Sequence, residues 1–152
     1  MTPDLAELYQ ALILDHNRSP RNCRAMANAD GRAEGYNPLC GDEITVWIKR
    51  DGDRIVDISF QSQGCAISRA SASLMTAAVK GKTTAEAELL FGGFHALITG
   101  APSPAPAPEL GKLAALAGVA EFPIRVKCAS LSWHALRAAL QQHEGSVPAS
   151  TE

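Results

Sequence analysis

The sequence predicts an α+β fold, in which a small antiparallel sheet of about three strands packs against helices. Residues 43–50 and 54–63 alternate apolar and polar side chains on either side of Asp51-Gly52-Asp53, which is the pattern of a β-hairpin. The segments that flank this hairpin change to the 3.6-residue period of helices. The chain has 152 residues, of which 46% are hydrophobic and 20% charged, and this favours one globular domain with its own core.

Before the hairpin, the sequence predicts one helix and one strand. Residues 3–16 place Leu5, Leu8 and Leu12 on one apolar stripe, which is typical of an amphipathic helix. Residues 17–22, NRSPRN, end this helix in a loop. A strand over residues 32–36 is more weakly patterned and would give the sheet its third strand.

After the hairpin, the pattern is helical almost to the end of the chain. The expected elements are a helix rich in small residues over 65–81, a helix over 83–100 capped by Thr83 or Thr84, a polyproline-like connector over 101–108, a short helix over 109–122 and an amphipathic helix over 125–142. We expect residues 1–143 to form a single domain and residues 144–152 to be a disordered tail.

Charge and hydropathy argue against several classes of partner. The formal net charge is −2 and the chain has no basic block, so nucleic acid is not an expected partner. No apolar run reaches the roughly 18 residues that a membrane span requires. The N-terminal segment has no basic region ahead of its apolar residues, so it does not resemble a signal peptide. We therefore expect a cytoplasmic protein whose cysteines stay reduced.

Four cysteines, at positions 23, 40, 65 and 128, are widely spaced and form no CxxC pair. Any shared site must therefore be assembled from distant parts of the fold. Cys40 lies in the turn-like segment YNPLCGDEI, with Asp42 one glycine away. Cys65 begins a predicted helix and Cys128 lies in the first turns of another, where the helix dipole favours a thiolate.

Three thiolates and one carboxylate would make a tetrahedral site for Zn²⁺ or for an iron–sulfur cluster. The simpler alternative is that each cysteine fills a hydrophobic core, as unpaired cysteines often do. This alternative suits Cys128 best and Cys40 least, because the turn that carries Cys40 should lie at the surface. The residues alone leave both interpretations open.

Three segments, NPLCGDEI, SQGCAISRASASLM and RVKCASLSWHAL, resemble the three cysteine motifs of the U-type iron–sulfur scaffold family, the IscU/NifU-like proteins. The N-terminal LILDHNRSPRN is similar to the opening segment of that family, and the motifs occur in the family's order over residues 5–142. Two features resemble the SufU branch: the long segment over 83–121, and Lys127 before Cys128 where IscU proteins carry a histidine.

The resemblance implies an IscU-like (SufE/NifU-like) fold and one metal held by Cys40, Asp42, Cys65 and Cys128. That metal would be Zn²⁺ in a SufU-like protein, whereas the matching residues of IscU-like proteins hold a [2Fe–2S] cluster. The implied partners are a SufS-type cysteine desulfurase and a downstream Suf scaffold or apo-protein acceptors. Cys23 matches none of the three motifs and is left out of the site.

In the SufU-like interpretation, Cys40 is the expected persulfide acceptor because its glycine-flanked turn can move more easily than a helix terminus. A partner group, for example a histidine, would take its place on the metal. Arg125 lies one helical turn before Cys128, where a cation would stabilise the anionic site, although a plain surface arginine fits the pattern equally well. His16 lies in the opening segment, where it could contact the desulfurase.

Three functions remain open at this point. The first is a zinc-dependent sulfurtransferase, which Lys127 and the 83–121 segment favour. The second is a non-enzymatic scaffold on which a [2Fe–2S] cluster is assembled and passed to apo-proteins. The third is a zinc-stabilised binding module without sulfur chemistry.

Overall fold

The computed structural model describes residues 3–38, 41–100, 110–141 and 149–150. Its elements are, in chain order, α1 (Pro3–Arg18), β1 (Gly31–Asn37), β2 (Asp42–Asp51), β3 (Arg54–Gln63), α2 (Ala66–Val79), α3 (Thr84–Thr99), the 3₁₀ helix η1 (Gly111–Glu121), α4 (Pro123–Gln141) and β4 (Ala149–Ser150). The α+β class is thereby confirmed, as are the helices on both sides of the hairpin in sequence.

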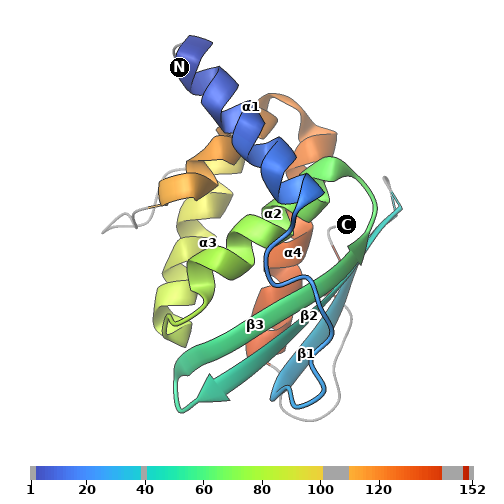
Figure 1. The fold of residues 1–152 in the computed structure, drawn as a ribbon, viewed down its shortest axis with the longest axis vertical. Helices are drawn as coiled ribbons and strands as arrows, with labels where there is room; N and C mark the ends of the chain where they lie inside the picture. The colour runs from blue at the N-terminus through green and yellow to red at the C-terminus, as the bar shows by residue number, and fades with distance from the viewer. Residues whose placement is uncertain (1–2, 39–40, 101–109, 142–148, 151–152) are drawn as a thin grey trace.

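The sheet has the strand order β3-β2-β1-β4, with antiparallel pairing among the first three strands (Figure 1). β1, the weakly patterned strand, alternates fully buried and exposed residues along its whole length. The two-residue β4 pairs in parallel with Gly35 and Tyr36 of β1. Of the predicted tail, the structure describes these two residues, and they form a strand; residues 144–148 and 151–152 lie outside the described residues.

Helices cover one face of the sheet, α4 against β1 and β2, and α2 against β3 (Figure 1). The inward-facing residues Val46, Ile48, Ile58 and Phe60 are completely buried. Trp133 of α4 is also buried and stacks on Phe94 of α3, with ring centroids 4.9 Å apart. α1 and η1 pack on the outer side of α2, so α2 lies at the centre of the helical layer.

The helix expected over 109–122 is a 3₁₀ helix, η1. Its buried apolar residues Leu113, Leu116 and Val119 recur every third position, and a 3₁₀ helix with three residues per turn places them in one row against the core. In the sequence alone, this spacing fits a short α-helix as well.

The last helix begins at Pro123, two residues before the predicted start. Proline is well tolerated in the first turn of a helix because its missing N–H would have no partner there. The residue before it, Phe122, is extended (φ −128°, ψ 97°), as a residue preceding proline tends to be, and this ends η1.

The predicted connector over residues 101–108 lies outside the described residues. Among the residues that the structure describes, none of the helices is long and apolar enough to cross a membrane.

Candidate metal centre

Three residues that are far apart in sequence meet at one end of the sheet. Asp42 begins β2, Cys65 is the N-cap residue of α2, and Cys128 lies in the second turn of α4. One ligand atom from each residue lies within 4.8 Å of the others. The fourth residue of the predicted set, Cys40, lies outside the described residues.

Asp42 and Cys65 are joined by two contacts. The backbone N–H of Cys65 donates to Oδ1 of Asp42 at 2.8 Å, and the Cys65 thiol lies 3.6 Å from Oδ2. The Cys65 sulfur also accepts the backbone N–H of Ser68 at 3.4 Å, as the side chain of an N-cap residue does. The helix terminus therefore orients the Cys65 sulfur and holds the Asp42 carboxylate beside it.

Gly64 makes this approach of strand and helix feasible. Its φ of 137° lies in a region that favours glycine. A Cβ at this position would overlap the carboxylate of Asp42. Gly64 is not among the site residues predicted from the sequence, although a glycine directly before a cysteine at a strand-to-helix junction is a usable signal.

Asn37 is a second site residue that the sequence patterns do not predict. Its side chain is completely buried, and its amide Nδ2 lies 3.8 Å from the Cys128 sulfur, to which it donates. Its backbone carbonyl accepts the N–H of Gly41 at 2.8 Å, and Asn37 pairs with Asp42 in the sheet register. Asn37 thus joins the end of β1 to the start of β2 and contacts Cys128 at the same time.

The chemistry of the site favours a cation. The Asp42 side chain is completely buried and Cys128 is only 2% exposed. No ion pair of Asp42 with a lysine or arginine is found in the described part of the chain. A buried carboxylate is costly unless it is paired or bound to a metal, so a positive ion between these groups would be strongly stabilising.

The geometry fits a tetrahedral metal. Ligand atoms bound at about 2.0–2.3 Å to one tetrahedral zinc ion lie roughly 3.3–3.8 Å from one another. The 3.6 Å between the Cys65 sulfur and Oδ2 of Asp42 falls in this range. Two sulfurs and one carboxylate oxygen are suitable donors for Zn²⁺ and for iron in a cluster.

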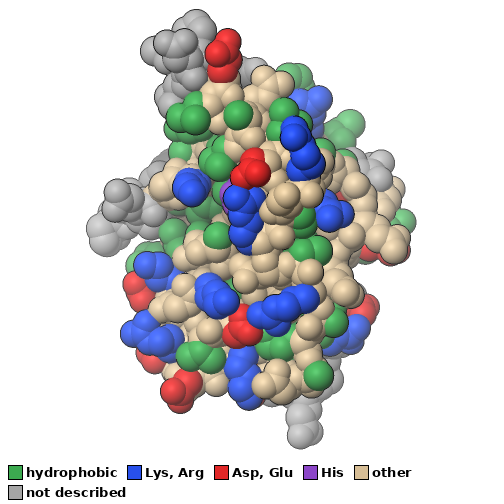
Figure 2. Space-filling view, in the orientation of Figure 1, with side chains coloured by type: hydrophobic (Ala, Val, Ile, Leu, Met, Phe, Trp, Pro, Cys, Tyr) green, Lys and Arg blue, Asp and Glu red, His purple; other side chains and the backbone are tan. Residues whose placement is uncertain are grey.

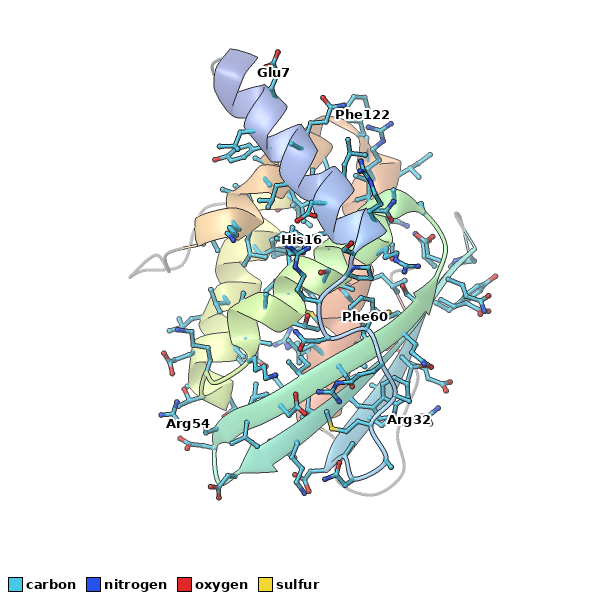
Figure 3. The ribbon with its side chains drawn as sticks, viewed as in Figure 1. Glu7, His16, Arg32, Arg54, Phe60 and Phe122 are labelled. Carbon is cyan, nitrogen blue, oxygen red and sulfur yellow. The ribbon has the colours of Figure 1, made fainter. Side chains whose placement is uncertain are left out.

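A largely apolar cavity of about 810 Å³ opens beside Cys65 and Cys128. It is bordered by α1, η1 and the start of α4, and the exposed side chains of Leu14, Phe122 and Ile124 lie around it. Figure 3 shows Phe122 near the same end of the molecule as the N-terminal half of α1. The site is therefore reachable from an apolar part of the surface.

The remaining predicted residues have other surroundings. Arg125 is exposed and lines this cavity, and its guanidinium lies 4.8 Å from the centroid of the Phe122 ring. That Arg125 stabilises the Cys128 thiolate stays a prediction. His16 is only 3% exposed, and its Nδ1 is hydrogen-bonded to Ser73 at 2.7 Å, so it is a structural residue rather than a contact for a partner.

Residues 8–129 match the family model of the NifU-like N terminal domain. The zinc-dependent sulfurtransferase SufU of Bacillus subtilis (strain 168) is 41% identical over 142 residues, which cover 93% of this chain and 95% of that protein. The iron-sulfur cluster assembly scaffold protein IscU of Streptococcus pyogenes serotype M1 is 42% identical over 91% of this chain and 86% of its own length.

Solved structures share the fold. The crystal structure of FiSufU from the thermophilic Fervidobacterium islandicum AW-1 superimposes with a TM-score of 0.79 and 35% identity, over 86% of this chain and 94% of that one. The crystal structure of a hypothetical protein superimposes with a TM-score of 0.82 and 42% identity, over 90% and 98% of the two chains.

Proposed function

The chain belongs to the NifU-like N-terminal domain family, and from this we propose that it serves iron–sulfur cluster assembly as a zinc-dependent sulfurtransferase. It would accept persulfide sulfur from a SufS-type cysteine desulfurase in the cytoplasm and pass it to a downstream Suf scaffold or to apo-proteins. The observation that supports this most directly is the meeting of Asp42, Cys65 and Cys128 beside an apolar cavity. The zinc-dependent sulfurtransferase of Bacillus subtilis, similar over nearly its whole length, supports the choice of zinc.

Zinc would be held by Asp42, Cys65 and Cys128, with Cys40 as the fourth ligand. Bound zinc would keep the coordinating thiols deprotonated. Cys65 and Cys128 are suited to a permanent role as ligands. The Cys65 sulfur is fixed by Ser68, whereas the Cys128 sulfur is nearly fully buried and contacts Asn37.

Cys40 is the proposed sulfur acceptor. Its thiolate would attack the outer sulfur of the desulfurase persulfide; a new S–S bond forms at Cys40, the old S–S bond breaks, and the desulfurase cysteine leaves as a thiolate. The electrons balance without an added oxidant or reductant, because the persulfide sulfur is transferred at its own oxidation level. Arg125, at the cavity beside Cys65 and Cys128, would stabilise the anionic charge during the exchange.

The alternative function is a scaffold on which a [2Fe–2S] cluster is assembled and transferred to apo-proteins. The relative from Streptococcus pyogenes, named as a scaffold and 42% identical, favours it. The two cysteines and one aspartate are suitable ligands for a zinc ion and also for a [2Fe–2S] cluster.

The deciding experiment counts zinc, iron and acid-labile sulfide per chain in protein purified without oxygen, and then follows transfer of labelled sulfur from a SufS-type desulfurase. We expect about one zinc, no sulfide, and sulfur acceptance that Cys40→Ala abolishes. Cys23→Ala, which removes an exposed thiol outside the site, is the matched control and should accept sulfur normally.

Other outcomes would identify the competing functions. Two irons and two sulfides per cluster would favour the scaffold. Normal sulfur acceptance by Cys40→Ala would contradict the assignment of the acceptor. A protein that binds zinc but has no thiol that reacts with persulfide would be a zinc-stabilised binding module.

A further inference from the structure

A second cavity, of about 560 Å³, lies between the C-terminal end of α1, the second half of α2 and the start of η1. We call it the α1–η1 cleft and define it by an apolar floor of Ala77, Ala78 and Leu110 and a rim of Arg21, Lys82 and Lys112. None of the three metal-centre residues lines it. Leu74 is nine residues along α2 from Cys65, which places the cleft about 14 Å from that ligand along the helix axis.

The rim of the cleft is positively charged. Among the residues that the structure describes, its lining includes three cationic side chains and no aspartate or glutamate, although the whole chain has a net charge of −2. Arg21 is ion-paired with Asp15 at 2.7 Å. Lys82 and Lys112 are exposed, and neither forms an ion pair within the described ranges of the chain. Figure 2 shows basic side chains on this face around the C-terminal end of α1.

The floor of the cleft is apolar and its wall is fixed. Ala77 is exposed and Ala78 and Leu110 are half-buried, so their apolar surface is accessible to a ligand, whereas the lining leucines Leu74, Leu90 and Leu113 are at most 8% exposed and add little. The backbone N–H of Arg21 donates to Oγ of Ser73 on α2 at 2.8 Å, and the same hydroxyl is bonded to His16. Figure 3 shows His16 beneath the C-terminal end of α1, beside α2. The rim residue Arg21 is therefore anchored to the helix that forms the floor.

We propose that the α1–η1 cleft binds a small organic anion that has an apolar body of several carbon atoms and a carboxylate head. The volume lies within the range of pockets for small ligands, about 300–1,000 Å³. The apolar body would lie on the floor of Ala77, Ala78 and Leu110, and the carboxylate would lie between the ammonium groups of Lys82 and Lys112. The charge of the rim selects an anion, and the floor distinguishes an anion with an apolar body from a fully hydrated one such as acetate.

An NMR titration tests this proposal with hexanoate as the probe, and with 1-hexanol and acetate as matched probes that lack the charge or the apolar body. Hexanoate should give saturable shifts confined to the backbone amides of residues 74–82 and 111–113. The other two probes should bind at least tenfold more weakly. Equal binding of 1-hexanol, shifts spread over the molecule, or no shifts would overturn the proposal.

Variants separate the charge of the rim from the shape of the floor. The double variant Lys82→Ala/Lys112→Ala should weaken hexanoate binding about tenfold, because two exposed charge contacts are lost. Lys49→Ala, which removes a lysine from the sheet, is the matched control and should bind normally. Ala77→Trp, at a lining position on α2, should block binding without changing the charge.

Unchanged hexanoate binding in the double variant would overturn the role of the rim. Binding of an acidic peptide by a protein that does not bind hexanoate would overturn the proposal in favour of a protein partner. The NMR spectrum of each variant, recorded without ligand, shows whether the fold is retained. None of these measurements depends on metal or on sulfur transfer, so the cleft and the proposed function can fail independently.

Discussion

Gly64 has two roles that substitution can separate. Gly64→Ala would place a methyl group against the Asp42 carboxylate and also strain the backbone at φ 137°. Gly81→Ala is the matched control, because Gly81 has φ 84° and open space around its Cα. We expect the control to lose about 1 kcal/mol of unfolding free energy. Gly64→Ala should lose roughly 3 kcal/mol, because overlap adds to strain.

Zinc affinity distinguishes the two glycines more sharply than stability does. Gly64→Ala should weaken zinc binding at least tenfold in a competition titration with a chelator, because Asp42 must move away from Cys65. Gly81→Ala should bind zinc normally. Equal zinc affinity of the two variants would mean that Gly64 is not required for the approach of Asp42.

Asn37 is predicted to tune the Cys128 sulfur through its N–H···S contact. Asn37→Ala should lose about 1–2 kcal/mol of stability, similar to Ser71→Ala, which removes a buried hydrogen bond to Ala129 on the same helix. With cobalt in place of zinc, Asn37→Ala but not Ser71→Ala should shift the sulfur-to-metal charge-transfer band, since of these two side chains only that of Asn37 donates to a ligand sulfur. An unshifted band would show that Asn37 contributes to packing and does not tune the Cys128 sulfur.

At the scale of single residues, the sequence predicted which residues lie in turns and at helix starts better than it predicted which distant residues contact one another. The turn around Gly41 and the helix start at Cys65 were predictable because glycine and helix-cap positions leave local signals. Asn37 was not, because its partner Cys128 lies 91 positions away and nothing local marks a buried amide. Gly64 left a local signal, but its reason, the carboxylate of Asp42, is again distant in sequence.

Among the elements, the contact between α1 and α2 should depend on pH through His16. Burial lowers the pKa of His16, and the nearby charge of Arg21 lowers that pKa further. The neutral ring is thus favoured in the folded state, whereas the unfolded chain takes up a proton near its ordinary pKa of about 6.5. Stability from His16 is therefore full above about pH 6.5 and is lost as the pH falls toward the folded-state pKa.

This dependence is measured by chemical denaturation of wild type and His16→Gln between pH 7 and pH 5. The wild-type protein should lose about 1–2 kcal/mol more than the variant over this interval, since one pH unit corresponds to about 1.4 kcal/mol per proton. The difference between the two proteins cancels the titration of groups that they share. Parallel pH profiles would show that His16 does not take part.

Element types were predictable where one period dominates. The hairpin strands and α2 follow clear patterns of two and of about 3.6 residues, and both appear as expected. η1 shows the limit, because its apolar residues at a spacing of three fit both a short α-helix and a 3₁₀ helix, and burial against the core decides between them. The pairing of β4 with β1 had no signal in two small residues.

For the whole molecule, removal of metal should lower stability substantially. The site joins β2, α2 and α4, and a ligand that binds only the folded state stabilises it by about 2.7 kcal/mol at 100 times its dissociation constant. We expect a chelator to lower Tm by several degrees in scanning calorimetry. Asp42→Ala should be nearly insensitive to the chelator. A chelator effect of the same size in Asp42→Ala would place the stabilising metal elsewhere.

The order in which the ligands occur along the chain has a consequence for biosynthesis. A ribosome releases Asp42 and Cys65 well before Cys128, which is supplied by the last long helix. A growing chain therefore exposes thiols for most of its synthesis without being able to assemble the metal centre. In the proposed function, zinc held by all of these residues would bind only after α4 has docked onto the sheet, so a chain truncated before α4 would carry Cys65 without the complete set of ligands.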